Sequence, residues 1–121
     1  MKNYEKNKSL LPKGINDLLE KRTYQDSFLT ESLMTNFKLN GYQRVSPPLI
    51  EFEENYTLFL DTTNQKNIFR VTDPISNKPM FIRNDITPQI ARIAANKLNN
   101  SSSPIRLSYA GYILRPKGSQ L

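Results

Sequence analysis

The sequence contains no cysteine, no histidine and no tryptophan among its 121 residues, and these absences exclude whole classes of chemistry. Without cysteine there is no disulfide scaffold, thiolate metal site or thiol nucleophile. Without histidine the usual general base is missing, which excludes Ser-His-Asp and Cys-His catalysis and histidine-ligated zinc. No apolar run approaches the roughly 18 residues of a membrane span, and no apolar signal core follows the N-terminus. We therefore expect a cytoplasmic protein without a membrane partner. Its acidic residues are scattered, so we expect no metal and no cofactor.

The net charge of +6 is distributed unevenly along the chain. Residues 1–22 carry six basic and three acidic groups, residues 23–85 carry six and eight, and five basic groups with no acidic group follow Asp85. A basic C-terminal third could attract a phosphate-bearing ligand, a nucleic acid or an acidic partner. The five cations lie apart in the sequence, however, so charge alone favours a solvated basic face.

The spacing of apolar residues predicts two main helices. Apolar side chains recur at intervals of three and four between residues 20 and 40, which predicts an amphipathic core helix that ends at a left-handed Gly41. Thr87 and Pro88 have the order of an N-cap followed by proline at the first helical position, which predicts a second helix to residue 98. A weaker helix is predicted over residues 53–60. Residues 1–9 are polar and lysine-rich, which predicts disorder before a domain over residues 10–121.

The strand pattern predicts an α+β fold, with an antiparallel sheet of roughly four strands and flanking helices. The extended segments are residues 42–45, 49–52, 68–72, 80–83 and 105–115, of which the third and fourth form a hairpin across a turn-rich connection. Pro47 and Pro48 remove two backbone donors, so their segment pairs only at an edge. The last, apolar strand requires a neighbour, either in the hairpin sheet or in another chain, or the sequence is a piece of a longer protein.

The cluster best suited to bind a ligand consists of Asp85, Thr87 and Arg115. Asp85 and Thr87 lie two residues apart after a strand, where the carboxylate can accept from an ammonium group and the hydroxyl can donate or accept. The free backbone donors at the start of the following helix favour an anion. Arg115 can bind a carboxylate or phosphate through two hydrogen bonds. The alternatives are ordinary capping of the helix by Asp85 and Thr87, and a surface role for Arg115.

Three runs of residues resemble class II aminoacyl-tRNA synthetases. GYQRVSPPLIE at residues 41–51 resembles motif 1, which forms the homodimer interface of that superfamily. LPKGINDL at residues 11–18 resembles the N-terminal segment of histidyl-tRNA synthetases, and RLSYAGYILR at residues 106–115 resembles the first strand of motif 2. Between them, IRNDITPQIAR at residues 82–92 stands where histidyl-tRNA synthetases have Arg-Pro-Glu-Gly-Thr. This run resembles the paralogous regulatory subunits of ATP phosphoribosyltransferase.

The resemblance implies a partial class II synthetase-like catalytic domain in the N-terminal portion of such a subunit, with motif 1 at about residues 41–51 and the start of motif 2 at about residues 105–115. It places Asp85 and Thr87 where the synthetases hold the amino group of histidine. Arg115 falls on the motif 2 arginine that binds phosphate and carboxylate. Ile86 replaces a glycine and Lys117 replaces the glutamate that reads adenine, so both departures disfavour adenylation.

The implied function is non-catalytic. Members of this branch join a short ATP phosphoribosyltransferase catalytic subunit in a hetero-octamer, support the first step of histidine biosynthesis, and take L-histidine as a possible effector. We expect homodimerisation through motif 1 and no nucleic-acid partner. Two alternatives are a fragment of a histidyl-tRNA synthetase, in which the basic C-terminal third faces ATP or tRNA, and a truncated product with no ligand pocket.

Overall fold

The computed structural model describes residues 11–56, 67–97, 100 and 102–116. In chain order the elements are α1 (Glu20–Leu39), β1 (Gln43–Arg44), β2 (Ile50–Phe52), α2 (Glu53–Tyr56), β3 (Phe69–Thr72), β4 (Pro79–Ile82), α3 (Thr87–Lys97) and β5 (Leu107–Ser108). The predicted disorder of residues 1–9 and the predicted helix beyond residue 56 lie outside the described residues. Among the described residues, no helix has both the length and the apolar character needed to cross a membrane.

The strands form two small sheets in place of the predicted single sheet of four. Strand β4 is central in an antiparallel sheet of order β2-β4-β3, in which Ile82 pairs with Ile50 on one side and Phe69 on the other. Strand β5 pairs in parallel with β1, Gln43 opposite Leu107. The α+β class and the hairpin are therefore confirmed. In place of the predicted sheet of roughly four strands there are an antiparallel sheet of three and a separate parallel pair: Pro47 and Pro48 have no N–H to donate, so no ladder continues from β1 into β2.

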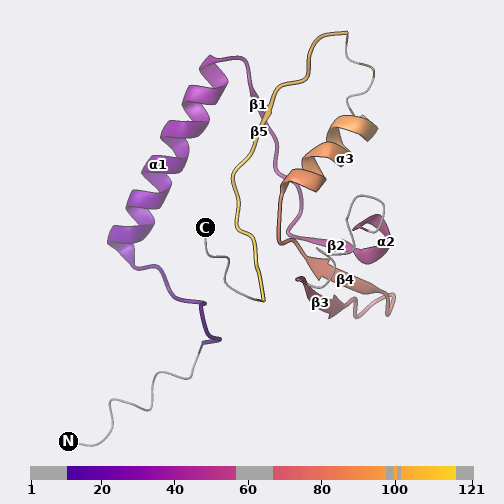
Figure 1. Cartoon of the computed structure of the whole chain (residues 1–121). Helices are drawn as coiled ribbons and strands as arrows, with labels where there is room; N and C mark the ends of the chain where they lie inside the picture. The colour runs from indigo at the N-terminus through magenta and orange to yellow at the C-terminus, as the bar shows by residue number, and fades with distance from the viewer. Residues whose placement is uncertain (1–10, 57–66, 98–99, 101, 117–121) are drawn as a thin grey trace, which may run out of the picture.

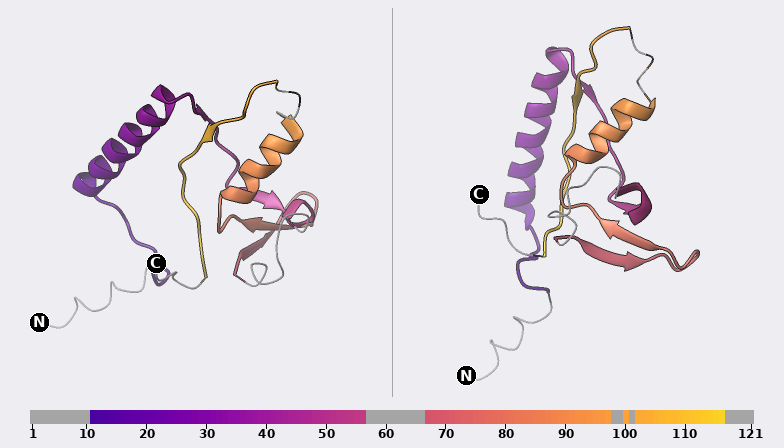
Figure 2. Two further views of the ribbon diagram at one scale, coloured as in Figure 1. Left: turned by 45° about the horizontal axis from the view of Figure 1, so that its top comes forward. Right: turned by 45° about the vertical axis from the view of Figure 1, so that its right-hand side comes forward.

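The β1–β5 pair occupies the middle of the molecule (Figure 1). Helix α1 stands on one side of this pair, and α3 with the three-stranded sheet stands on the other, an arrangement that both views in Figure 2 repeat. The last strand was predicted over residues 105–115, but only Leu107 and Ser108, which form β5, pair with another strand. After β5 the chain passes beside the segment that follows β4. There the Leu114 amide donates to the Arg83 carbonyl at 3.0 Å.

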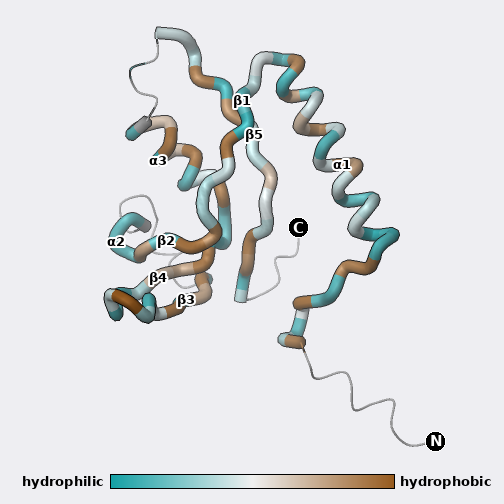
Figure 3. The backbone as a smooth tube through the Cα atoms, turned by 180° about the vertical axis from the view of Figure 1, so that it is seen from behind, coloured by the Kyte–Doolittle hydropathy of each residue, from teal (hydrophilic) through white to brown (hydrophobic). Residues whose placement is uncertain are grey.

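Helix α1 has the predicted length, but it is not a core helix in this chain. Of its residues only Met34 is buried. Tyr24, Phe28 and Leu29 are 71%, 65% and 59% exposed, and apolar positions alternate with polar ones along the whole helix (Figure 3). The reason is that the described residues supply a neighbour for α1 on one side only. Gly41 has a φ of 85°, which confirms the predicted left-handed end of the helix.

The buried core lies around β4. Phe81 is fully buried and packs with Ile68, which precedes β3. Strand β4 is central in its sheet, so the backbone of Phe81 is covered by a neighbouring strand on each side. Burial continues into the connection between β4 and α3, where Arg83, Asn84 and Ile86 are all at most 8% exposed. This connection carries Asp85, and the next predicted ligand-binding residue, Thr87, begins α3.

Candidate ligand-binding site

Asp85 lies in the four-residue connection that leads from β4 into α3, Thr87 is the first residue of α3, and both side chains are exposed. The Oδ1 atom of Asp85 accepts a hydrogen bond from the Thr87 amide at 2.9 Å. The carbonyl of Ile86 accepts from the amides of Gln89 and Ile90. Ile86 is therefore the N-cap, because the N-cap carbonyl accepts the first hydrogen bond of a helix. The prediction of Thr87 as N-cap is wrong by one residue: Thr87 is the first helical residue and Pro88 the second.

Because Ile86 is the N-cap, the Thr87 hydroxyl does not cap the helix. Its Oγ1 atom lies 3.1 Å from the hydroxyl of Tyr109, which follows β5. Sequence analysis assigned no role to Tyr109. The signal that could have identified it is strand alternation, because Tyr109 and Arg115 are six residues apart and side chains at even spacings in an extended chain share a face.

Arg115 reaches the same connection from the C-terminal segment. Its Nε donates to the carbonyl of Asn84 at 3.1 Å, in a partly buried contact. Asn84 is the residue before Asp85, so Arg115 lies beside the segment that carries the other two predicted residues. A hydrogen bond through Nε leaves the two terminal nitrogens of a guanidinium group for a carboxylate or phosphate.

Arg83 holds these segments in register. It is 8% exposed, and its Nε and Nη1 donate to the carbonyls of Tyr112 at 2.8 Å and Pro47 at 3.0 Å. No carboxylate forms an ion pair with Arg83 among the residues that the structure describes. Its charge is instead solvated by main-chain carbonyls, as is required of a buried cation. Gly111 passes directly over the guanidinium group, where a Cβ atom would not fit.

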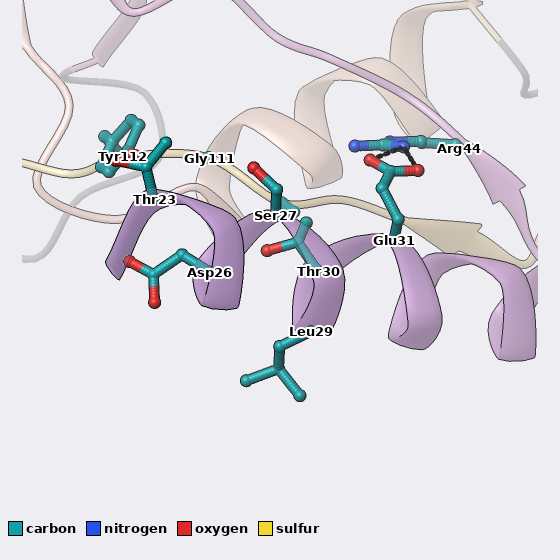
Figure 4. A pocket seen from close by; sticks show the side chains of 10 residues that line it. Thr23, Asp26, Ser27, Leu29, Thr30, Glu31, Arg44, Gly111 and Tyr112 are labelled. Carbon is teal, nitrogen blue, oxygen red and sulfur yellow. Dashed lines mark hydrogen bonds and ion pairs between the residues drawn. The ribbon is translucent and has the colours of Figure 1, made fainter. Parts of the chain in front are cut away.

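Two of the cavities in the described part of the chain border α1, and neither of these includes Asp85, Thr87 or Arg115. One, of about 450 Å³, lies between α1 and residues 110–112; the other, of about 510 Å³, lies between α1 and β1. In the lining of the 450 Å³ cavity, the side chains of Glu31 and Arg44 point toward each other (Figure 4) and form an ion pair at 3.0 Å. The convergence of the three predicted residues on one ligand therefore stays a prediction. No cluster of metal-ligating side chains occurs in the described parts of the chain.

The long helix, the β1–β5 pair and the sheet around β4 define a class II aminoacyl-tRNA synthetase-like domain. Two solved structures share this fold: an ATP phosphoribosyltransferase regulatory subunit/histidyl-tRNA synthetase from Bacillus halodurans C (TM-score 0.75, 24% identity, covering 90% of this chain and 28% of that one) and the apo histidyl-tRNA synthetase of S. aureus (TM-score 0.70, 18% identity, covering 87% and 25%). A family model described as histidyl-tRNA synthetase matches residues 14–121. The chain belongs to the histidyl-tRNA synthetase family.

Within the family, two similar curated proteins are named as regulatory subunits. The ATP phosphoribosyltransferase regulatory subunit of Paramagnetospirillum magneticum is 48% identical over 115 residues, which cover 95% of this chain and 30% of that protein. The protein of the same name from Rhodospirillum centenum is 47% identical over 113 residues, covering 93% and 29%. These matches confirm the resemblance predicted from residues 82–92. The chain spans about 30% of the length of these relatives.

Proposed function

We propose that this chain is the N-terminal portion of a cytoplasmic, non-catalytic regulatory subunit of ATP phosphoribosyltransferase, which acts in the first step of histidine biosynthesis. The observation that carries the proposal is the 48% identity to a protein of that name. The run of residues from Asp85 to Gln89, which stands in place of the synthetase Glu-Gly-Thr, supports it. In this proposal, residues 10–121 form the first part of the synthetase-like domain, with motif 1 at about residues 41–51 and the start of motif 2 at about residues 105–115.

The proposed effector is L-histidine. Asp85 accepts hydrogen bonds from its ammonium group, Thr87 contributes its hydroxyl, and Arg115 binds its carboxylate. The exposed side chains of Asp85 and Thr87 and the hydrogen bond of Arg115 to the neighbouring Asn84 support this arrangement. A ligand shifts an equilibrium only by its difference in affinity for the two states. Histidine therefore regulates by binding one assembly state better than the other.

The proposed partners are the short catalytic subunit, in a hetero-octamer, and a second copy of this chain through motif 1. Support for the second contact comes from α1, which leads directly into motif 1. Exposed Tyr24 and Phe28 stack on each other at 6.4 Å between ring centroids. Burial of apolar surface contributes roughly 25 cal/mol per Å², so a partner that covers these rings is favoured.

Calorimetric titration with L-histidine tests the effector site. Asp85→Asn and Arg115→Gln should each weaken binding about tenfold or more, because a hydrogen bond between charged groups contributes about 1.5–3 kcal/mol. Asp26→Asn and Arg22→Gln are the matched controls: they make the same charge changes in an exposed ion pair on α1 and should leave the affinity unchanged. Absence of heat at millimolar histidine would refute the site.

Two further assays separate the alternatives. Co-elution with a short ATP phosphoribosyltransferase catalytic subunit is expected, and its absence together with absence of histidine binding would favour a truncated product without a pocket. Histidine-dependent ATP–pyrophosphate exchange is expected to be at background, because Ile86 replaces the family glycine. Clear exchange would identify a synthetase fragment and contradict the regulatory proposal.

A further inference from the structure

Residues 83–92, the segment that carries Asp85 and Thr87, are attached to motif 1 by a backbone hydrogen bond from the Arg83 amide to the Leu49 carbonyl and by side chains. Three residues of this segment bind three of motif 1. Arg83 Nη1 donates to the Pro47 carbonyl at 3.0 Å, and Gln89 Nε2 donates to the Pro48 carbonyl at 2.7 Å. Arg92 forms an ion pair with Glu51.

At Pro47 and Pro48 the attachment depends on these side chains. Neither Pro47 nor Pro48 has an N–H, so their carbonyls are the only main-chain groups that can form hydrogen bonds at these positions. Both carbonyls are occupied by the side-chain donors just named. Backbone bonding resumes at Leu49, whose carbonyl accepts from the Arg83 amide at 3.1 Å, and continues in the ladder at Ile50, which pairs with Ile82.

The attaching side chains are buried or partly buried and have little alternative bonding. Gln89 is 3% exposed, and the side chains of Arg92 and Glu51 are 21% and 11% exposed. Gln89 Oε1 and Arg92 Nε are buried without a hydrogen-bond partner among the described residues. The side chains of Gln89 and Arg92 are therefore largely removed from water, and the contact with motif 1 replaces the hydrogen bonds that water would form. Loss of that contact leaves a buried polar group unsatisfied, which is costly.

The attaching residues and the proposed ligand residues alternate along one short segment. Asp85 and Thr87 lie between Arg83 and Gln89 and are exposed, whereas Arg83 and Gln89 are buried against motif 1. A displacement of Thr87 toward a ligand therefore moves Gln89, which is two residues further along the rigid first turn of α3. The same displacement changes the hydrogen bond to Pro48.

We propose that Arg83, Gln89 and Arg92 are positioning residues, which hold Asp85 and Thr87 against motif 1 and couple histidine binding to the order of residues 47–52. This inference rests on the proposed histidine site. By linkage, the coupling is reciprocal: an ordered motif 1 raises histidine affinity, and bound histidine protects motif 1.

The test combines calorimetry with amide hydrogen exchange on the full chain. In the wild type, saturating L-histidine should slow exchange in β2 at least about threefold. Gln89→Met keeps the volume and helix propensity but removes the donor, so it should weaken histidine binding about fivefold and abolish the added protection of β2. Ala95→Gln, at an exposed position of the same helix, is the matched control and should change neither quantity.

Arg92 provides an independent pair of variants if Gln89→Met does not fold. Arg92→Lys keeps an ion pair with Glu51 and should retain the protection, whereas Arg92→Met should lose it. Histidine binding without added protection of β2 in the wild type would overturn this inference and leave the proposed effector site standing. Unchanged affinity and protection in both Gln89→Met and Arg92→Met would overturn it as well. Failure of the wild type to bind histidine refutes the site itself.

Discussion

The contact between Gly111 and Arg83 gives the most direct test of the structure. A Cβ atom at position 111 would lie less than 3.0 Å from Arg83 Nη2, and 3.3 Å from both Arg83 Cζ and Ile86 Cδ1. The guanidinium group cannot withdraw freely, because it is buried and donates to the Pro47 and Tyr112 carbonyls. Gly111→Ala must therefore break one of these hydrogen bonds or displace residues 110–115.

The expected cost follows from either outcome. Loss of a hydrogen bond from a charged donor costs about 1.5–3 kcal/mol, and forcing extra volume into a packed site costs about 1–3 kcal/mol. We expect Gly111→Ala to lower the free energy of unfolding by about 1–3 kcal/mol. At about 4 °C per kcal/mol for a domain of this size, Tm should fall by about 4–12 °C.

Thermal unfolding followed by circular dichroism measures this effect. Ala110→Ser adds one atom at the exposed neighbouring position and should change the free energy of unfolding by no more than about 0.5 kcal/mol. Arg83→Lys removes Nη2, so Gly111→Ala should cost about 1–2 kcal/mol less in that background. A Tm decrease below about 2 °C, or an equal cost in both backgrounds, would refute the argument that Arg83 excludes a side chain at position 111.

Three further predictions concern the turns and the exposed helix. The hydrogen bonds from the Ser76 hydroxyl and the Ile75 amide hold the pKa of Asp73 below its ordinary value of 3.8. The native state thus favours the carboxylate, and this stabilisation should be lost as pH falls through the folded-state pKa. An NMR titration should show the low pKa in the wild type and a higher one in Ser76→Ala. Gly41→Ala should cost about 1 kcal/mol in chemical denaturation, because φ is 85° there, and no change would contradict the left-handed conformation. Phe28→Lys should leave the stability of the monomer within about 0.5 kcal/mol, since Phe28 is 65% exposed, but should weaken any dimer in analytical ultracentrifugation.

Local sequence patterns predicted most backbone conformations correctly. The spacing of apolar residues predicted a helix at residues 20–40, and α1 spans Glu20–Leu39. The turn-rich run after Thr72 predicted the β3–β4 hairpin, in which Asp73 accepts hydrogen bonds from the Ile75 and Ser76 amides. These features depend on residues close together in the sequence. Their steric restrictions and local hydrogen bonds do not require contacts with distant residues.

The composition of the candidate site was predictable in part. The resemblance of residues 82–92 drew attention to Asp85 and Thr87, and the structure places Arg115 against the residue before Asp85. Tyr109 and Gln89 were missed, because their partners are 22 and 41 residues away in the sequence. No local pattern indicates which distant acceptor a polar side chain will meet.

The sequence by itself determined the family, the positions of the helices and hairpin, and the chemical groups at the candidate site. Only the tertiary structure decided that β5 pairs in parallel with β1, that most of α1 stays exposed, and that Arg83 is solvated by carbonyls of two distant segments. The physical reason is that backbone conformation responds to near neighbours, whereas pairing and burial depend on which groups remain unsatisfied when the whole chain has folded. Here Pro47 and Pro48 offer only carbonyls to a neighbouring segment, and the side-chain donors that bind these carbonyls come from the segment that carries Asp85 and Thr87.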